Sequence, residues 1–403
     1  MTPAVAGRRA ACPDGTGVAR RAMADDKKNP RETPSMPLMG RPAFAMPLAQ
    51  VHDAVPPWVA ASADALDQGV HTNTSARPTD VLPRLAEAGY LGLGIPRAAG
   101  GQGGDITDAL AAVVALATQS LTVAFVYWAQ RGSLEIVASS PQAQAREARL
   151  PALLSGARAG APGLSNAMKS LGGLEPMRVQ ASRDDGGWRL DGRVPWTTNA
   201  RPAGFSVMLG ATRPDGGVAV FAVDGPSTGL RAEPQGHLIG LRGSHTAALA
   251  LQAVAANAHA VLHEDLASAL PAFRPAFIGL QCGLSLGLAS ACIAAARAAG
   301  PLAGAVAQGL DACERELGSL YDELLAGLRS GAYATGPAAL FRVRIALAYQ
   351  VRQAAWLELQ AGGSRAYQEV NGTGFARRWR EAAFIPIITP TLAQLESQLA
   401  ALR

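Results

Sequence analysis

Trp196 and Thr198 are two residues apart in the stretch DGRVPWTTNA (residues 191–200). Alternate side chains of a strand point to the same face, so an indole ring and a hydroxyl would lie side by side there. A flat aromatic wall with a hydrogen-bond donor beside it suits the binding of a flat heteroaromatic ring. The same pair also fits the ordinary core of a β hairpin, and spacing alone leaves both interpretations open.

The stretch GLSNAMKSLGG (residues 163–173) precedes that strand and carries Ser165, Asn166 and Lys169. Ser165 and Asn166 carry a hydroxyl and an amide, which can donate and accept hydrogen bonds. Lys169 is the only lysine after residue 28. Its charge could pair with an anionic ligand, or the side chain could be an ordinary solvated loop lysine, and both readings stay open.

The elements that must position these residues fall into three zones. Apolar residues recur at helical spacing over residues 80–89 and 108–117, and an aromatic helix is expected at 125–130. Short apolar runs separated by Asp-Gly and Gly-Gly turns predict strands, namely a hairpin at 182–200 and runs at 205–211, 218–223 and 247–254. Long helical stretches then return. We therefore expect an α+β protein, with an N-terminal helical domain (46–160), a β domain (161–263) and a C-terminal helical bundle (264–403).

The first 45 residues differ from the rest of the chain. They carry eight lysines and arginines against four acids, so most of the net charge of +5 lies there. We expect this polar, proline-containing tail to be disordered, with Met36, Met39 and Met46 as alternative starts. The remaining body is close to neutral, so nucleic-acid binding is not expected. No apolar secretory segment is visible, and a cytoplasmic protein is predicted.

Residues 275–296 form a run of 22 residues without a charge. Arginines close both ends, no aromatic belt flanks the run, and its Gly, Ala, Ser and Cys content is weakly hydrophobic. These features favour a helix buried in a bundle over a membrane span. Its glycines and alanines permit close helix approach, and we expect a homodimer or homotetramer formed through the bundle.

The cysteines and histidines show no metal-binding spacing. The four cysteines contain no CxxC pair, and the six histidines are scattered. Cys282 and Cys292 lie inside the apolar run, where a small buried thiol is the ordinary reading. We expect neither a metal site nor a disulfide framework, which fits a reducing compartment.

Several motifs, in this order, resemble those of the acyl-CoA dehydrogenase family, including its flavin-dependent monooxygenase relatives. They are the glycine-rich GYLGLGIPRAAGGQGGD (89–105), DGRVPWTTNA (191–200), GLRGSHT (240–246), and GGSRAY (362–367) with RRWREAAF (377–384). The resemblance covers about residues 47–403. It implies a helical N-terminal domain, a central β-barrel or sandwich domain and a C-terminal four-helix bundle.

The resemblance also implies a flavin, FAD or alternatively FMN. Trp196 would lie against the flavin ring and Thr198 near its N5 atom. Ser165 and Asn166 would bond its pyrimidine edge. Lys169 would favour an anionic reduced ring or pair with the pyrophosphate. Arg297 would serve the adenine half, although the phenylalanine that usually follows in this turn is missing.

The sequence departs from the family at the catalytic base. The family places a glutamate about nine residues after the arginine of an Arg-Asp-Ala motif, and counting from Arg380 lands on Thr389. The second usual position lies just before the arginine of the first bundle helix, where Phe273 precedes Arg274. Neither residue is a carboxylate, and threonine cannot act as a base near neutral pH without help. No catalytic residue can therefore be assigned.

Three residues remain as candidates for substrate contact. Arg274 resembles the arginine that approaches the acyl-carrier end of the substrate. Gln130 and Ser244 are expected to line the pocket. Each of them could instead be an ordinary surface or core residue.

Three functions fit these observations. The first is an oxidoreductase that acts on an acyl thioester without the usual glutamate, with an electron-transfer partner. The second is a two-component monooxygenase of the same fold that receives reduced flavin from a reductase and acts on another small molecule. The third is a catalytically silent scaffold.

Overall fold

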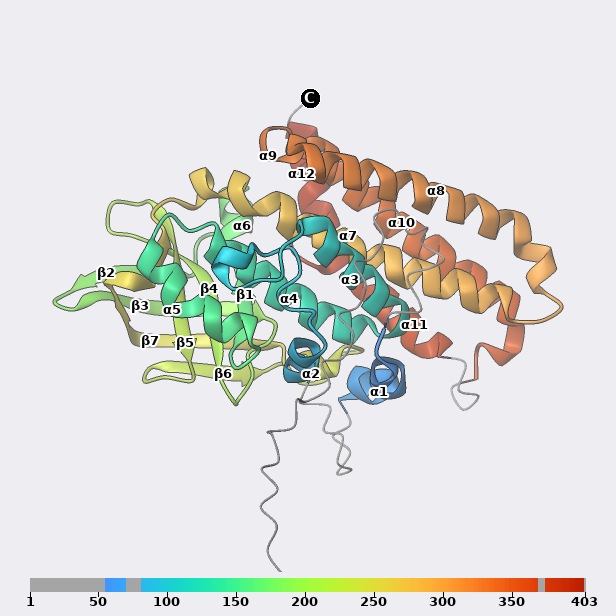
Figure 1. The fold of residues 1–403 in the computed structure, drawn as a ribbon, viewed down its shortest axis with the longest axis horizontal. Coiled ribbons are helices and arrows are strands. Elements are labelled where there is room, and N and C mark those ends of the chain that lie inside the picture. The colour runs from blue at the N-terminus through green and yellow to red at the C-terminus, as the bar shows by residue number, and fades with distance from the viewer. Residues whose placement is uncertain (1–54, 70–80, 369–373, 402–403) are drawn as a thin grey trace, which may run out of the picture. The chain divides into compact units, whose positions relative to one another are not determined.

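The computed structural model describes residues 55–69, 81–368 and 374–401 (Figure 1). The basic tail predicted over residues 1–45 lies outside them, as do the alternative starts. Helices come first, strands follow, and helices end the chain, as the sequence predicts. The helices of the first part are α1 (Pro57–Gln68), α2 (Val81–Glu87), α3 (Ile106–Gln119), α4 (Leu121–Ala138) and α5 (Ala143–Leu154).

The glycine-rich motif connects α2 to α3 by a tight turn. Gly94 has φ of 72°, and a Cβ there would lie 2.4 Å from the backbone oxygen of Asp105, so only glycine fits. Asp105 then begins α3 with a capping box, in which its side chain accepts from the Thr107 amide and Asp108 reaches back to the Asp105 amide. The helix predicted at 108–117 is therefore confirmed, with a start defined by the motif.

The strands form one mixed eight-stranded sheet. Their bounds are β1 (Ala159–Gly163), β2 (Val179–Asp184), β3 (Gly187–Thr197), β4 (Phe205–Thr212), β5 (Val218–Gly225), β6 (Leu230–Pro234), β7 (Ala247–Asn257) and β8 (Val261–His263). The order across the sheet is β6-β7-β3-β2-β4-β5-β8, and β1 pairs with β4 in parallel. The predicted hairpin is β2–β3, where Asp184 pairs with Gly187. This sheet is the central β domain that the resemblance implies.

One predicted loop is a helix. Residues 163–173 leave β1 and form α6 (Ser165–Leu171). We expected this stretch to be a loop before the hairpin. The buried side chains of Ala167 and Met168 stabilise the helical turn instead. As a result, Ser165 and Lys169 are one helical turn apart and share a face.

The last part of the chain consists of helices. They are α7 (Leu266–Arg297), α8 (Ala303–Ser330), α9 (Ala332–Thr335), α10 (Pro337–Gly362), α11 (Phe375–Phe384) and α12 (Leu392–Ala401). In Figure 1, α7, α8 and α10 run alongside one another, and α3 and α4 lie against α7. These helices form the expected bundle.

Helix α7 lies at the centre of this packing. It is long and apolar enough to cross a membrane. However, 94% of its apolar 18-residue segment is buried inside the protein. Its glycines allow α3 to approach closely, because a Cβ on Gly287 would lie 2.3 Å from the Val114 backbone oxygen. We predicted self-association from the glycines and alanines of this helix. The glycine at position 287 instead allows a close contact within the chain. Cys282 and Cys292 are buried on this helix, and burial raises the pKa of both thiols.

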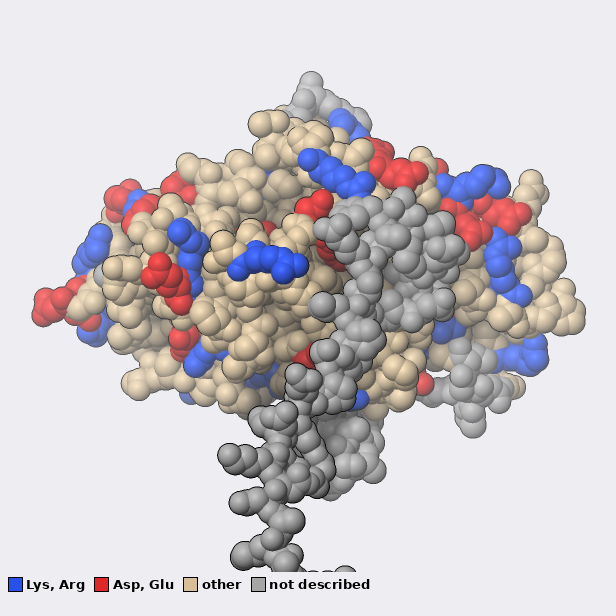
Figure 2. Space-filling view, in the orientation of Figure 1, with Lys and Arg blue, Asp and Glu red and all other residues tan. Residues whose placement is uncertain are grey.

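Acidic and basic side chains are interspersed over the surface that Figure 2 shows. Many pair with one another, such as Arg297 with Asp311 and Glu314, or Arg189 with Asp184. Such exposed pairs contribute little stability. In the described residues, no cluster of three or more His, Cys, Asp or Glu side chains could hold a metal ion.

Candidate functional site

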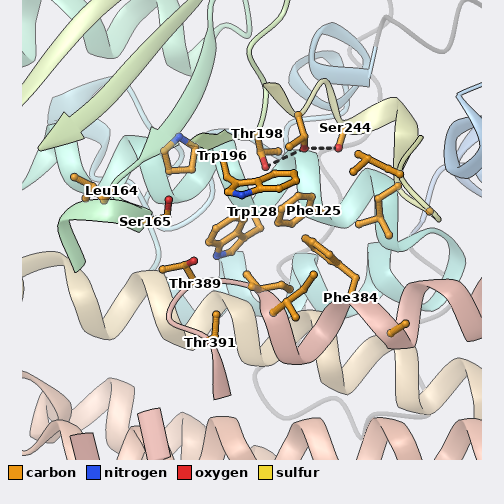
Figure 3. A pocket seen from close by; sticks show the side chains of 18 of the residues that line it. Phe125, Trp128, Leu164, Ser165, Trp196, Thr198, Ser244, Phe384, Thr389 and Thr391 are labelled. Carbon is orange, nitrogen blue, oxygen red and sulfur yellow. Dashed lines mark hydrogen bonds between the residues drawn. The ribbon is translucent and has the colours of Figure 1, made fainter. Parts of the chain in front are cut away.

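A cavity of about 410 Å³ lies between the sheet and the helices (Figure 3). Its walls come from segments far apart in the chain: α4, α6, the end of β3, the loop before β7, α7, and the segment from α11 to α12. The side chains that line it are those of Phe125, Trp128, Pro162, Leu164, Ser165, Met168, Lys169, Trp196, Thr198, Leu238, Ile239, Leu241, Ser244, Thr246, Phe277, Arg380, Ala383, Phe384, Ile387, Ile388, Thr389 and Thr391, together with Gly240.

The sheet supplies one wall through Trp196 and Thr198. Trp196 lies near the end of β3, and it is 50% exposed although other residues of that strand are buried, so it does not belong to the hairpin core. The register of β3 against β7 shifts between Val194 and Thr197, and such an irregularity re-aims side chains at a site. The indole therefore presents a flat face to the cavity, and the Thr198 hydroxyl lies on the same wall (Figure 3).

A small group of hydroxyls extends from Thr198. The Thr246 hydroxyl is 3.4 Å from the Thr198 hydroxyl and 2.8 Å from that of Ser244. The turn that brings them together is strained, because Leu241 and His245 on either side of the short helix Arg242–Ser244 have positive φ. Backbone strain of this kind concentrates at functional sites. Ser244 thus lines the pocket as predicted, at its most polar edge.

Asn199 fixes this wall from behind, a role that the sequence did not reveal. Its φ is 63°, and its buried amide donates to the backbone oxygens of Val126 at 3.1 Å and Gly160 at 3.2 Å. These bonds join the end of β3 to α4 and β1. An Asn in the left-handed region is uncommon but tolerated. In the sequence, the asparagine that ends the WTTN run (residues 196–199) is the signal that could have pointed to this role.

Helix α6 supplies the second polar edge. Ser165 and Lys169 both line the cavity, and no hydrogen bond of the Ser165 hydroxyl occurs among the described residues. Asn166 does not share this face. Its amide donates to Glu175 at 3.0 Å and to the Pro176 backbone oxygen at 2.9 Å. Its side-chain oxygen also accepts from the backbone amide N–H of Arg178. Asn166 therefore fixes the chain after α6 rather than contacting a ligand.

Aromatic rings form the opposite side of the cavity. Phe125 and Trp128 stack with centroids 5.2 Å apart and planes 5° apart. The ring centroid of Phe384 lies 4.9 Å from that of Phe125, and the ring centroid of Phe277 lies 4.9 Å from that of Trp128. The sequence indicated the aromatic helix but not these partners, because α7 and α11 reach them only in the tertiary structure.

Of the residues that the structure describes, two cations, Lys169 and Arg380, line the cavity, and no Asp or Glu does. Arg380 is paired with the buried Asp67 at 2.7 Å, and Lys169 lies 3.7 Å from Glu175. The neighbouring Glu381 turns away from the cavity. It pairs with Arg377 and accepts from the Leu121 backbone amide at 3.1 Å. Burial raises its pKa to about 7.

Thr389 lies in the cavity wall, whereas Phe273 is fully buried against the His263 ring. Of the two expected base positions, only the one held by Thr389 faces the cavity. Two buried side chains hold the segment that carries it. Arg344 donates to the Ile385 backbone oxygen at 2.7 Å, and Gln281 donates to that of Thr389 at 2.7 Å. The wall that would carry the base is therefore rigidly placed.

Three other expected contacts lie elsewhere. Gln130 is completely buried; its amide donates to the Leu153 and Arg158 backbone oxygens, and its oxygen accepts from the Gly160 amide. All its polar atoms are thus engaged in joining α4 to β1. Arg297 is paired with Asp311 and Glu314 on α8. Arg274 does not line the cavity; it is half-buried near the Phe341 ring, and burial lowers its pKa.

An N-terminal helical part, a central sheet and a C-terminal helical bundle, with a cavity at their junction, define the acyl-CoA dehydrogenase fold. The family model of the acyl-CoA dehydrogenase N-terminal domain matches residues 49–157. Butyryl-CoA dehydrogenase from Megasphaera elsdenii superimposes with a TM-score of 0.76 at 20% identity, covering 88% of this chain and 97% of that one.

The curated relatives agree at the level of sequence. The probable acyl-CoA dehydrogenase fadE25 of Mycobacterium tuberculosis is 24% identical over 218 residues, which cover 52% of this chain and 56% of the relative. The mitochondrial isovaleryl-CoA dehydrogenase of Arabidopsis thaliana is 27% identical over 201 residues, covering 48% and 47%. The chain thus spans about half the length of these relatives. Together with the fold, the matches show that this chain is similar to acyl-CoA dehydrogenases, most directly over the N-terminal domain at residues 49–157.

Proposed function

We propose that this protein is a flavin-dependent oxidoreductase that acts on an acyl thioester. The observation that carries the proposal is the convergence of Trp196, Thr198 and Ser165 on one cavity opposite a cluster of aromatic rings. They come from different elements, and the half-exposed indole of Trp196 adds a flat apolar surface to the cavity wall.

The residues present fit a flavin ring. The ring is flat and apolar with a polar edge, and it requires a flat wall and a few fixed hydrogen-bonding groups. Trp196 offers the wall, Thr198 a hydroxyl beside it, and Ser165 and Lys169 a polar edge on α6. When bound, a flavin supplies an acceptor for the electron pair that leaves the substrate as hydride.

The structure offers less for the adenine half of FAD. Arg297 is engaged by two carboxylates within its own chain, so it has no free charge for a phosphate. We therefore keep FAD as the first proposal and FMN as the alternative, and Arg297 is no longer part of the proposed site. The proposed site residues are Ser165, Lys169, Trp196, Thr198 and Ser244.

Among the described residues that line the cavity, no carboxylate is available to remove the α-proton of a thioester. Thr389 occupies the usual position, and its hydroxyl is not basic near neutral pH. Asp67, which pairs with the lining residue Arg380, and Glu381, which follows Arg380 in the chain, are both bound to arginines. A substrate that is dehydrogenated here would have to supply the proton acceptor itself or present an unusually acidic α-proton.

A second candidate function draws on the same observation. A two-component monooxygenase of this fold needs no α-proton abstraction, so the absence of an acid among the lining residues favours it. It would receive reduced flavin from a separate reductase, while the dehydrogenase would pass electrons to an electron-transfer partner. A silent scaffold requires no bound flavin at all, which separates it from both.

One preparation tests all three. The purified full chain is examined for flavin absorbance and titrated with FAD and FMN. It is then assayed with a series of acyl-CoA thioesters and an electron-accepting dye, and with reduced flavin and oxygen. Turnover with a dye supports the first function and oxygen-dependent product the second. If FAD and FMN both bind more weakly than ~100 μM, about −5.5 kcal/mol, the first and second functions are rejected.

The remaining proposals concern assembly and location. We propose a cytoplasmic homodimer or homotetramer formed through the C-terminal bundle, without nucleic-acid or membrane partners. Because α7 is already buried within the chain, the contact must use outer faces of the bundle, such as that of Trp356 on α10, which is half exposed. Light scattering that finds only monomer at micromolar concentration would reject this assembly.

A further inference from the structure

The carboxylate of Glu175 is shared by two cations. Lys169 Nζ lies 3.7 Å from its Oε1, and Arg178 Nη2 lies 3.5 Å from its Oε2. Glu175 also accepts from the Asn166 amide at 3.0 Å, so its position is fixed. One carboxylate therefore offsets only part of two positive charges, and the net charge of Lys169, Arg178 and Glu175 together is positive.

Only one of these cations faces the cavity. Lys169 is among the lining residues, on the same face of α6 as Ser165, whereas Arg178 lies outside the lining and its side chain is 48% exposed. Helix α6 is itself fixed, because Gln394 of α12 donates to the Met168 backbone oxygen at 3.2 Å. Lys169 thus projects a charge into the cavity from a rigid base.

Lys169 is also the less neutralised of the two cations in the lining. Arg380 forms two hydrogen bonds to Asp67, at 3.0 and 2.7 Å, and Asp67 is completely buried. The Lys169 contact with Glu175 is longer, and that carboxylate is shared. No Asp or Glu is among the described lining residues, so Lys169 is the charged side chain that α6 contributes to the cavity wall.

We propose that Lys169, opposed by Glu175, sets the reduction potential of the flavin bound in this cavity. The inference rests on the proposed function. A flavin ring gains electron density on reduction, so a nearby positive charge stabilises the reduced form more than the oxidised form. A carboxylate beside that charge has the opposite effect. The Lys169–Glu175 pair would thereby adjust the potential without contacting the reacting carbon atoms of the substrate.

The test compares four variants of the full chain loaded with FAD at low ionic strength, where charge effects are least screened. The reduction potential is measured by equilibration with redox dyes, and the affinity for oxidised FAD by titration. Lys169→Met is expected to weaken binding of reduced FAD relative to oxidised FAD about tenfold, which is a shift of about 30 mV to more negative potential. Lys169→Arg keeps the positive charge, so its reduction potential should stay close to that of the unmodified protein.

Glu175→Gln and Arg178→Met provide the matched controls. Glu175→Gln keeps an oxygen for the Asn166 amide but removes the negative charge, so the potential should move in the positive direction. Arg178→Met removes the other cation that pairs with Glu175, which lies outside the cavity. It should change the affinity for reduced FAD relative to oxidised FAD by less than about twofold.

Equal shifts in Lys169→Met and Arg178→Met, or shifts of the same sign in Lys169→Met and Glu175→Gln, would overturn this inference alone. If the unmodified protein binds neither FAD nor FMN, the proposed function and this inference fail together.

Discussion

The buried carboxylate of Asp67 accepts a hydrogen bond from Nη2 of Arg380 at 2.7 Å, across 313 residues of sequence. Its other oxygen accepts from the backbone amide of Leu241 at 2.9 Å. Arg380 and Leu241 both line the cavity, whereas Asp67 does not. Helix α1 therefore helps to build the site without contributing a lining residue.

This relationship predicts that Asp67→Asn is destabilising. The substitution removes the charge partner of Arg380 in a buried setting, and we expect the free energy of unfolding to fall by ~1–3 kcal/mol. Asp64→Asn on the same helix is the control. Asp64 pairs with Arg377 but is 74% exposed, so its loss should cost less than ~0.5 kcal/mol. Urea unfolding measures both, and equal effects would contradict the proposed role of Asp67.

Glu381 predicts a dependence of stability on pH. Burial raises its pKa from the usual 4.5 to about 7, so the folded protein retains a proton that the unfolded chain has lost within that window. The contribution of Glu381 to stability is therefore greatest below the window and falls as pH rises through it.

Glu381→Gln removes this titration while keeping an acceptor for the Leu121 amide. Between pH 4.5 and pH 8, the unmodified protein should lose roughly 1–3 kcal/mol more stability than the variant. Unfolding curves at the two pH values give the difference. A glutamine variant with the same pH dependence would show that Glu381 titrates normally.

Thr389→Glu should create or raise dehydrogenase activity toward an acyl-CoA thioester. A positioned general base contributes typically ~10²–10⁴-fold, and the segment is held in place by Gln281 and Arg344. Thr391→Glu, which adds a carboxylate two residues further along the same wall, is the control and should not reproduce the gain. Fast turnover by the unmodified protein that Thr389→Glu abolishes would mean that the base lies elsewhere.

Two tryptophans of the same strand should respond in opposite ways. Trp196→Ala should weaken flavin binding by on the order of 1 kcal/mol or more while hardly changing stability, because the indole is half exposed. Trp188→Ala should cost ~3–5 kcal/mol of stability, because that indole is buried against Phe221 with centroids 5.5 Å apart. Flavin titration and thermal unfolding of both variants provide the comparison. If Trp196→Ala destabilises the protein as much as Trp188→Ala, Trp196 belongs to the core.

The sequence by itself determined the order of the three parts and a share of the site. Hydrophobic periodicity and turn residues are local properties, so they located α3, α4 and the β2–β3 hairpin. The motif around Trp196 and the count from Arg380 to Thr389 likewise depend only on neighbouring residues. Both residues lie in the cavity wall.

Only the tertiary structure decided which polar side chains are free to bind a ligand. Asn166, Gln130 and Arg297 carry suitable groups, but each is consumed by partners that no local pattern specifies. The Asp67–Arg380 pair is invisible in the sequence for the same reason. A side chain is available at a site only after buried hydrogen bonds and ion pairs have been satisfied, and those partners are set by long-range packing.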